Sequence, residues 1–102
     1  MATFLLEIYA PKNARIDVEL LAMRARRAAA DVSTEGRRVR CLRSILVPED
    51  ETCFLLFEAD TADDVRLTAA RAEVAFGRVL DAVADENENR TNDRGANESM
   101  NP

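Results

Sequence analysis

The sequence predicts an α+β fold in which two helices cover one face of a four-stranded antiparallel sheet. The first observation behind this prediction is a hairpin pattern over residues 38–58, where two apolar, β-branched-rich runs flank Pro48, Glu49, Asp50 and Glu51. The second is that a strand-like and a helix-like segment precede the hairpin, while a helix-like and a short strand-like segment follow it. The order is therefore βαββαβ, which is the order of the ferredoxin-like sandwich with its strands arranged 4-1-3-2.

The hairpin should turn at residues 48–51, because Pro48 lacks an amide hydrogen and the acidic residues after it tolerate turn geometry. Three facing pairs follow from a turn centred near residues 49 and 50, namely Arg43 with Leu56, Cys41 with Glu58, and Ile45 with Phe54. Since side chains alternate along a strand, the face under the helices should carry Leu42, Ser44, Leu46, Cys53, Leu55 and Phe57. The uncovered face should carry Cys41, Arg43, Ile45, Val47, Thr52, Phe54, Leu56 and Glu58.

The first strand and the first helix have recognisable limits. Residues 3–9 alternate between the two faces of a strand and end before Pro11. Apolar residues then recur at three- and four-residue spacing over residues 18–32, which predicts an amphipathic helix. Asp17 is placed to cap its first turn, and Gly36 should stop it.

The second helix should begin after Thr61, whose hydroxyl can accept a hydrogen bond from the amide of Asp64. Its inner face is expected to be a narrow stripe made of Val65, Ala69, Ala72 and Phe76. Residues 79–83 fit a short last strand, and they also fit a continuation of this helix.

Composition excludes several classes of function. The net charge of -5 disfavours nucleic acid as a partner, because binding to phosphates requires a concentrated positive surface. The chain has no His, so it lacks the commonest general base and the commonest metal ligand. With three glycines in total, a glycine-rich phosphate loop is also excluded.

The chain length fits one domain, which we expect to span residues 1–84, followed by a disordered polar tail over residues 85–102. There is no signal peptide and no long apolar run, so we expect a soluble cytoplasmic protein without contact to a membrane. The predicted register places Cys41 and Cys53 on opposite faces, which favours two buried free thiols over a disulfide.

Candidate site residues gather on the uncovered face, where Glu7, Tyr9, Arg43 and Glu58 are expected to lie near one another with Cys41 beside Glu58. An arginine between two carboxylates could orient a polar ligand group, or a desolvated glutamate could act as a base. Alternatively, Arg43 neutralises Glu7 or Glu58, within one chain or across a dimer interface, and nothing binds.

We expect no metal site and no cofactor from the residues themselves. Carboxylates and two thiols are present, but no CxxC-like spacing occurs and no imidazole is available to favour a late transition metal.

Residues 39–59, read as Val-Arg-Cys-Leu-Arg-Ser-Ile-Leu-Val-Pro-Glu-Asp-Glu-Thr-Cys-Phe-Leu-Leu-Phe-Glu-Ala, resemble a family of small bacterial proteins of uncharacterised function. Some members of that family are described as nickel-binding and ferredoxin-like. The resemblance extends over residues 3–84 and includes Asp64-Val-Arg and Phe76-Gly-Arg-Val. It implies the fold, a dimer, and Glu7, Arg43 and Ser44 as matching positions near the open sheet face.

The same resemblance does not extend to the metal ligands. Family members often carry His where this chain has Ile8, Arg43 or Thr68. Nickel is therefore implied by the family alone and not by the residues of this chain.

Three hypotheses for the function remain open. The first is a homodimeric ligand-binding or accessory protein with its site between the open sheet faces, formed by Glu7, Tyr9, Cys41, Arg43, Ser44 and Glu58. The second is a cofactor-independent enzyme of the dimeric α/β-barrel kind, similar to small monooxygenases or cyclases that act on an apolar substrate. The third is a purely structural dimer. A cavity with converging polar groups would favour the first two hypotheses.

Overall fold

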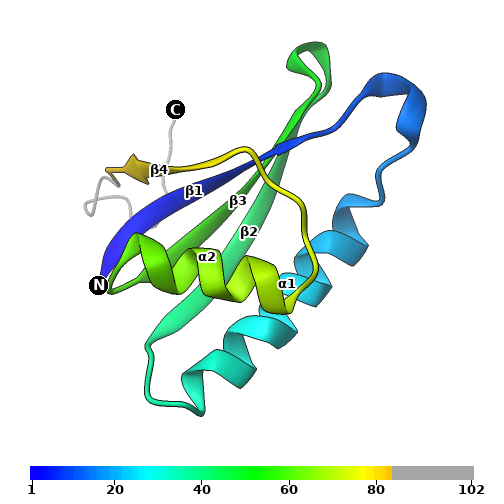
Figure 1. The fold of residues 1–102 in the computed structure, drawn as a ribbon. Helices are drawn as coiled ribbons and strands as arrows, with labels where there is room; N and C mark the ends of the chain where they lie inside the picture. The colour runs from blue at the N-terminus through cyan, green and yellow to red at the C-terminus, as the bar shows by residue number, and fades with distance from the viewer. Residues whose placement is uncertain (84–102) are drawn as a thin grey trace, which may run out of the picture.

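The computed structural model describes residues 1–83, and the expected polar tail lies outside the described residues. The chain forms β1 (Ala2–Tyr9), α1 (Val18–Ser33), β2 (Val39–Val47), β3 (Thr52–Ala59), α2 (Ala62–Arg71) and β4 (Arg78–Ala82) (Figure 1). Two short 3-10 turns, η1 (Lys12–Ala14) and η2 (Pro48–Asp50), follow β1 and β2.

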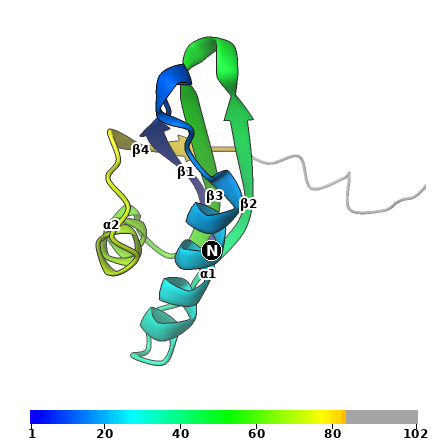
Figure 2. The same ribbon diagram turned by 90° about the vertical axis from the view of Figure 1, so that its right-hand side faces the viewer.

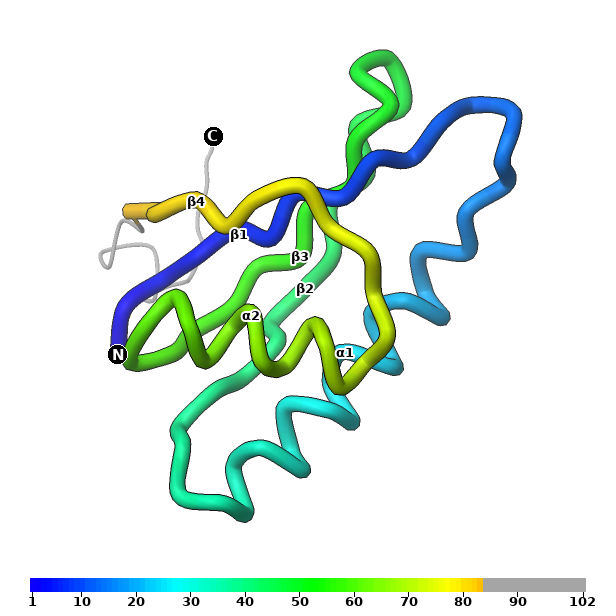
Figure 3. The backbone as a smooth tube through the Cα atoms, in the orientation of Figure 1, coloured from blue at the N-terminus to red at the C-terminus, as the bar shows by residue number. Residues whose placement is uncertain are grey.

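The four strands form one antiparallel sheet in the order β2-β3-β1-β4. The connection after α2 crosses the molecule and brings β4 beside β1 (Figure 3). This confirms the predicted ferredoxin-like α+β fold with its strand order 4-1-3-2. Of the two predictions for residues 79–83, the last strand is confirmed over most of its length, because β4 spans Arg78–Ala82.

Both helices pack on the same face of the sheet (Figures 1 and 2). The strands alternate in burial on this side, and their buried residues form one cluster with those of the helices. Helix α1 contributes Ala22, Ala25, Ala28, Ala29 and Val32 at the three- and four-residue spacing of one helical face. Among the described residues, the helices therefore close the core on one side of the sheet only.

The helix caps act as predicted. The carboxylate of Asp17 accepts a hydrogen bond from the amide of Leu20 at 3.0 Å. The hydroxyl of Thr61 accepts one from the amide of Asp64 at 3.2 Å. Each of these bonds satisfies an amide that has no partner within the first turn of its helix.

Helix α2 ends at Arg71, before the end of the stripe expected from the sequence. Glu73 has a left-handed backbone with φ 59°, which a helix interior does not accommodate. The guanidinium of Arg24 donates to the carbonyl oxygens of Ala72 and Glu73 at 2.6–3.0 Å. Arg24 on α1 therefore caps the end of α2.

The predicted hairpin register is confirmed for Arg43 opposite Leu56 and for Ile45 opposite Phe54. It is wrong for Cys41, which lies opposite Phe57, while Arg40 lies opposite Glu58. The reason is a β-bulge between Cys41 and Arg43. An extra residue on one strand shifts the pairing by one position and turns every side chain before it to the other face.

The bulge also changes the placement of the cysteines. Cys41 and Cys53 both lie on the helix-covered face, so the prediction of opposite faces is wrong. Both are free and buried, which confirms the prediction of two buried thiols. Burial raises the pKa of Cys41 to about 11, although the nearby charge of Arg26 opposes this shift. Both thiols are therefore protonated at neutral pH.

Candidate functional site

The site expected from the sequence lies on the face of the sheet that no described helix covers, which we call the open face. The pairing of the strands arranges its side chains in rows across the sheet. One row is Ala82, Thr3, Glu58 and Arg40, and the next is Leu80, Leu5, Leu56 and Arg43. The third is Arg78, Glu7, Phe54 and Ile45, and the last is Tyr9, Thr52 and Val47.

The centre of the open face is apolar. Leu80, Leu5 and Leu56 are adjacent across three strands, and each is only half-buried. Phe54 and Ile45 extend this patch in the neighbouring row. Since no described element covers these side chains, the patch is open to a second molecule.

Ion pairs border the apolar patch. The Nε atom of Arg78 donates to Glu7 at 2.7 Å, and this hydrogen bond raises the pKa of Arg78. The guanidinium of Arg40 lies 3.4 Å from the carboxylate of Glu58. In both cases the two residues face each other directly across neighbouring strands.

These ion pairs contradict the prediction that Arg43 neutralises Glu7 or Glu58 within one chain. Glu7 and Glu58 are paired with Arg78 and Arg40, and Arg43 makes no ion pair within residues 1–83. Arg43 is exposed at the end of the leucine row, where its direct neighbour is Leu56. The sequence analysis did not identify Arg40 and Arg78 as the partners of these glutamates. Which residues face each other depends on how β2 pairs with β3 and how β4 pairs with β1.

A signal for Arg40 is present in the sequence. Arg40 and Arg43 are three positions apart, so a regular strand would place one of them in the core. The register of β4, which brings Arg78 opposite Glu7, has no comparable signal in the short run of residues 78–82.

Four of the six candidate residues share the open face, and two do not. Tyr9 lies at its border opposite Thr52 and is 70% exposed. Ser44 pairs with Leu55 on the helix-covered face, which confirms the predicted register, whereas the position near the open face that the family resemblance implied is wrong. The same correction applies to Cys41, which the bulge removes from the neighbourhood of Glu58.

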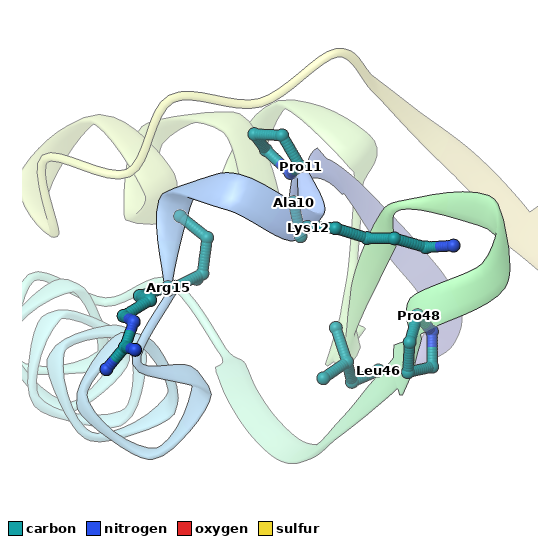
Figure 4. Close-up of a pocket in the computed structure, with 7 residues that line it drawn as sticks. Ala10, Pro11, Lys12, Arg15, Leu46 and Pro48 are labelled. Atoms are coloured by element: carbon teal, nitrogen blue, oxygen red, sulfur yellow. The ribbon is translucent and has the colours of Figure 1, made fainter.

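Three cavities are lined mainly by residues outside the open face. One of about 240 Å³ lies between the β1–α1 loop and the hairpin tip (Figure 4). Glu51 holds these two segments together, because its carbonyl oxygen accepts from the amide of Ala10 at 2.7 Å and its carboxylate from the amide of Lys12 at 2.9 Å. Lys12 extends toward the Pro48 turn while Arg15 points away from it, so the two cations do not converge (Figure 4).

The other two cavities border α1. One of about 210 Å³ lies between α1 and α2 and is lined by Arg24, Arg27, Ala28, Asp31, Arg71, Ala72 and Glu73. The other, of about 250 Å³, lies between α1 and β2.

Over residues 1–83, no three His, Cys, Asp or Glu side chains are close enough together to hold a metal ion. None of the described helices is long and apolar enough to span a membrane.

No protein-family model matches the chain, and neither does any curated protein or solved structure. The resemblance to nickel-binding, ferredoxin-like proteins therefore stays a prediction.

Proposed function

We propose that the protein is a small homodimeric ligand-binding or accessory protein, in which the open faces of two copies pack against each other. The observation that carries this proposal is the half-buried row of Leu80, Leu5 and Leu56, with Phe54 and Ile45 beside it. Soluble monomers rarely leave a contiguous apolar patch of this kind in water. A second copy supplies a surface of the same chemistry, which a two-fold interface requires.

The charges of the open face fit such an interface. The pairs Glu7–Arg78 and Arg40–Glu58 are neutral as units, so covering them strands no charge. Arg43 is different, because no described residue neutralises it. In a two-fold dimer its guanidinium meets an acceptor of the partner subunit or of a ligand held between the faces.

The ligand-binding part of the proposal rests on the polar groups at the edge of the patch. Tyr9 and Arg43 are exposed and present a hydroxyl and a guanidinium to anything enclosed between the two faces. A small apolar molecule with one acidic or polar group matches this combination.

A purely structural dimer is the second candidate. It is favoured by the ion pairs Glu7–Arg78 and Arg40–Glu58, which already pair these charges of the open face within one chain. In this case the two faces fill the space between them, and Arg43 pairs with a carboxylate of the other copy.

Native mass spectrometry of the full-length protein purified from its own host tests both parts. We expect the mass of a dimer, with an additional small-molecule mass that disappears on denaturation. A dimer without added mass favours the structural candidate. A monomer at micromolar concentrations contradicts the proposal.

A further inference from the structure

The groove between α1 and the first half of β2 is a second surface with a defined chemistry. It has a volume of about 250 Å³ and is lined by Arg26, Ala29, Ala30, Ser33, Val39, Arg40 and Cys41. Helix α1 packs alongside β2, and β2 is an outer strand of the sheet (Figures 1 and 2). We call this surface the α1–β2 groove.

The backbone of β2 faces this groove with hydrogen-bonding groups that β3 does not use. The hydroxyl of Ser33 donates to the carbonyl oxygen of Val39 at 3.1 Å, so this carbonyl points away from β3. In an antiparallel strand the N–H and C=O of one residue point to the same side, and this side alternates with each residue. Val39 and Cys41 therefore direct both groups outward, whereas Arg40 bonds to β3 opposite Glu58. No strand within residues 1–83 pairs with this edge.

The charges of the groove have one sign. Its charged lining residues are Arg26 and Arg40. No carboxylate of the described residues forms an ion pair with Arg26. Arg40 pairs with Glu58 on the open face at 3.4 Å, but its side chain is 67% exposed and also lines the groove, where no carboxylate is among the lining residues. The Cys41 thiol does not compensate them, because burial raises its pKa to about 11 and keeps it neutral. The floor between the two arginines is made of small side chains, which leaves room for a ligand group.

We propose that the α1–β2 groove binds an extended acidic peptide segment, which pairs with the outer edge of β2 and places a carboxylate between Arg26 and Arg40. An exposed strand edge is a template for strand addition, and side-chain pockets beside it supply the specificity. The bulge after Cys41 ends the regular edge. The paired segment is therefore short, and its acidic side chain carries much of the selectivity.

Two other occupants fit less well. A free phosphate would use the outward N–H groups but would face the outward carbonyl oxygen of Cys41, which a peptide strand can satisfy and an anion cannot. A second copy that paired through its own β2 would bring Arg40 and Arg43 of both chains together. Like charges in close cross-strand positions destabilise a sheet.

The test uses the full-length protein and a dye-labelled seven-residue peptide of alternating valine and threonine with a central glutamate. We expect fluorescence anisotropy to show binding that weakens about tenfold when the central glutamate becomes glutamine, because a charge-assisted hydrogen bond is lost. Methylating the peptide amides that would face β2 should abolish binding, whereas methylating the alternate amides should not. In amide NMR spectra the peptide should shift the signals of Val39 and Cys41.

Protein variants complete the test. Arg26→Gln should weaken binding about tenfold by removing one of the two cations. Arg27→Gln is the matched control, because it makes the same charge change on the same helix but lies at the cavity between α1 and α2. Equal binding of both methylated peptides, equal effects of the two variants, or full competition by millimolar inorganic phosphate would each overturn the proposal.

Discussion

Ile45 and Leu46 allow a sharp test of the proposed dimer, because they are neighbours on β2 with opposite orientations. Ile45 is 42% exposed on the open face, and Leu46 is 45% exposed on the helix-covered face. An aspartate at either position makes the same change in charge and nearly the same change in exposed apolar area. Only Ile45 belongs to the proposed interface.

The magnitude follows from the exposure of Ile45. Burying a whole aliphatic side chain contributes about 1.5–3 kcal/mol, so covering the exposed part of Ile45 contributes about 1 kcal/mol per chain. An aspartate loses this contribution and also brings an unpaired carboxylate into the interface. Even an uncharged polar group buried without a partner costs about 1–3 kcal/mol, so the further cost is at least this large per chain. Over two chains the loss is about 4 kcal/mol or more, which raises the dissociation constant about a thousandfold.

Sedimentation equilibrium of Ile45→Asp and Leu46→Asp, at matched micromolar concentrations, measures this difference. We expect monomers for Ile45→Asp and an unchanged dimer for Leu46→Asp, with both variants folded by circular dichroism. A dimer in both variants would refute the placement of the interface on the open face. A monomer in both would show that the effect of an aspartate is not specific to the open face, and it would count against this placement as well.

Three further predictions concern individual residues and the absence of His. Arg24→Ala should lower the free energy of unfolding by about 1–3 kcal/mol in urea titrations, because it removes the charge-assisted hydrogen bonds to Ala72 and Glu73. An unchanged unfolding midpoint would show that α2 does not need this cap. Burial raises the pKa of Cys41 from 9.0 to about 11, so the contribution of the buried thiol to stability is complete below pH 9 and is lost as the pH rises toward 11. In denaturant titrations between pH 9 and 11, the free energy of unfolding of Cys41→Ala should therefore change less with pH than that of the wild type. Parallel profiles would contradict the raised pKa of Cys41. Calorimetry should show Ni²⁺ binding no tighter than that of a generic acidic surface, because the chain has no His; a stoichiometric sub-micromolar site would support the resemblance to nickel-binding proteins.

The fold was predictable because local signals agreed with one another. Alternation marked the strands, and Asp17 and Thr61 marked the helix starts through caps that the structure contains. The strands joined by helix crossovers, β1 with β2 and β3 with β4, each have one strand between them, as the predicted order 4-1-3-2 requires. Each of these signals depends on a few adjacent residues, which a single sequence displays directly.

The errors arose where a contact between distant segments decides the outcome. The end of α2 depends on Glu73 adopting a left-handed backbone and on Arg24, which is 48 positions from Ala72, reaching its carbonyl oxygen. Likewise, the pairing of Glu7 with Arg78 depends on the register of a five-residue edge strand. The predicted ion pair of Arg43 with Glu7 or Glu58 within one chain is wrong for this reason. Glu7 pairs with Arg78 and Glu58 pairs with Arg40.

The bulge in β2 has a physical cause that explains the remaining error and links the two proposed surfaces. If the register of Arg43 opposite Leu56 continued without interruption, Arg40 would point into the core and Cys41 would point out beside Glu58. Burying an unpaired arginine costs several kcal/mol, whereas one extra residue in an outer strand costs little. The bulge therefore turns Arg40 outward to Glu58 and brings the Cys41 thiol into the core.

The same shift determines what β2 presents to each side. Beyond the bulge, Arg43, Ile45 and Val47 face the open face, where the dimer is proposed. Before it, the outward amides of Val39 and Cys41 face the α1–β2 groove, with Arg40 at its border. The two surfaces share Arg40, which pairs with Glu58 on the open face and also lines the groove. Ile45 does not line the groove, so a protein made monomeric by Ile45→Asp should still have an intact groove. Dimer formation and peptide binding can therefore be tested independently of each other.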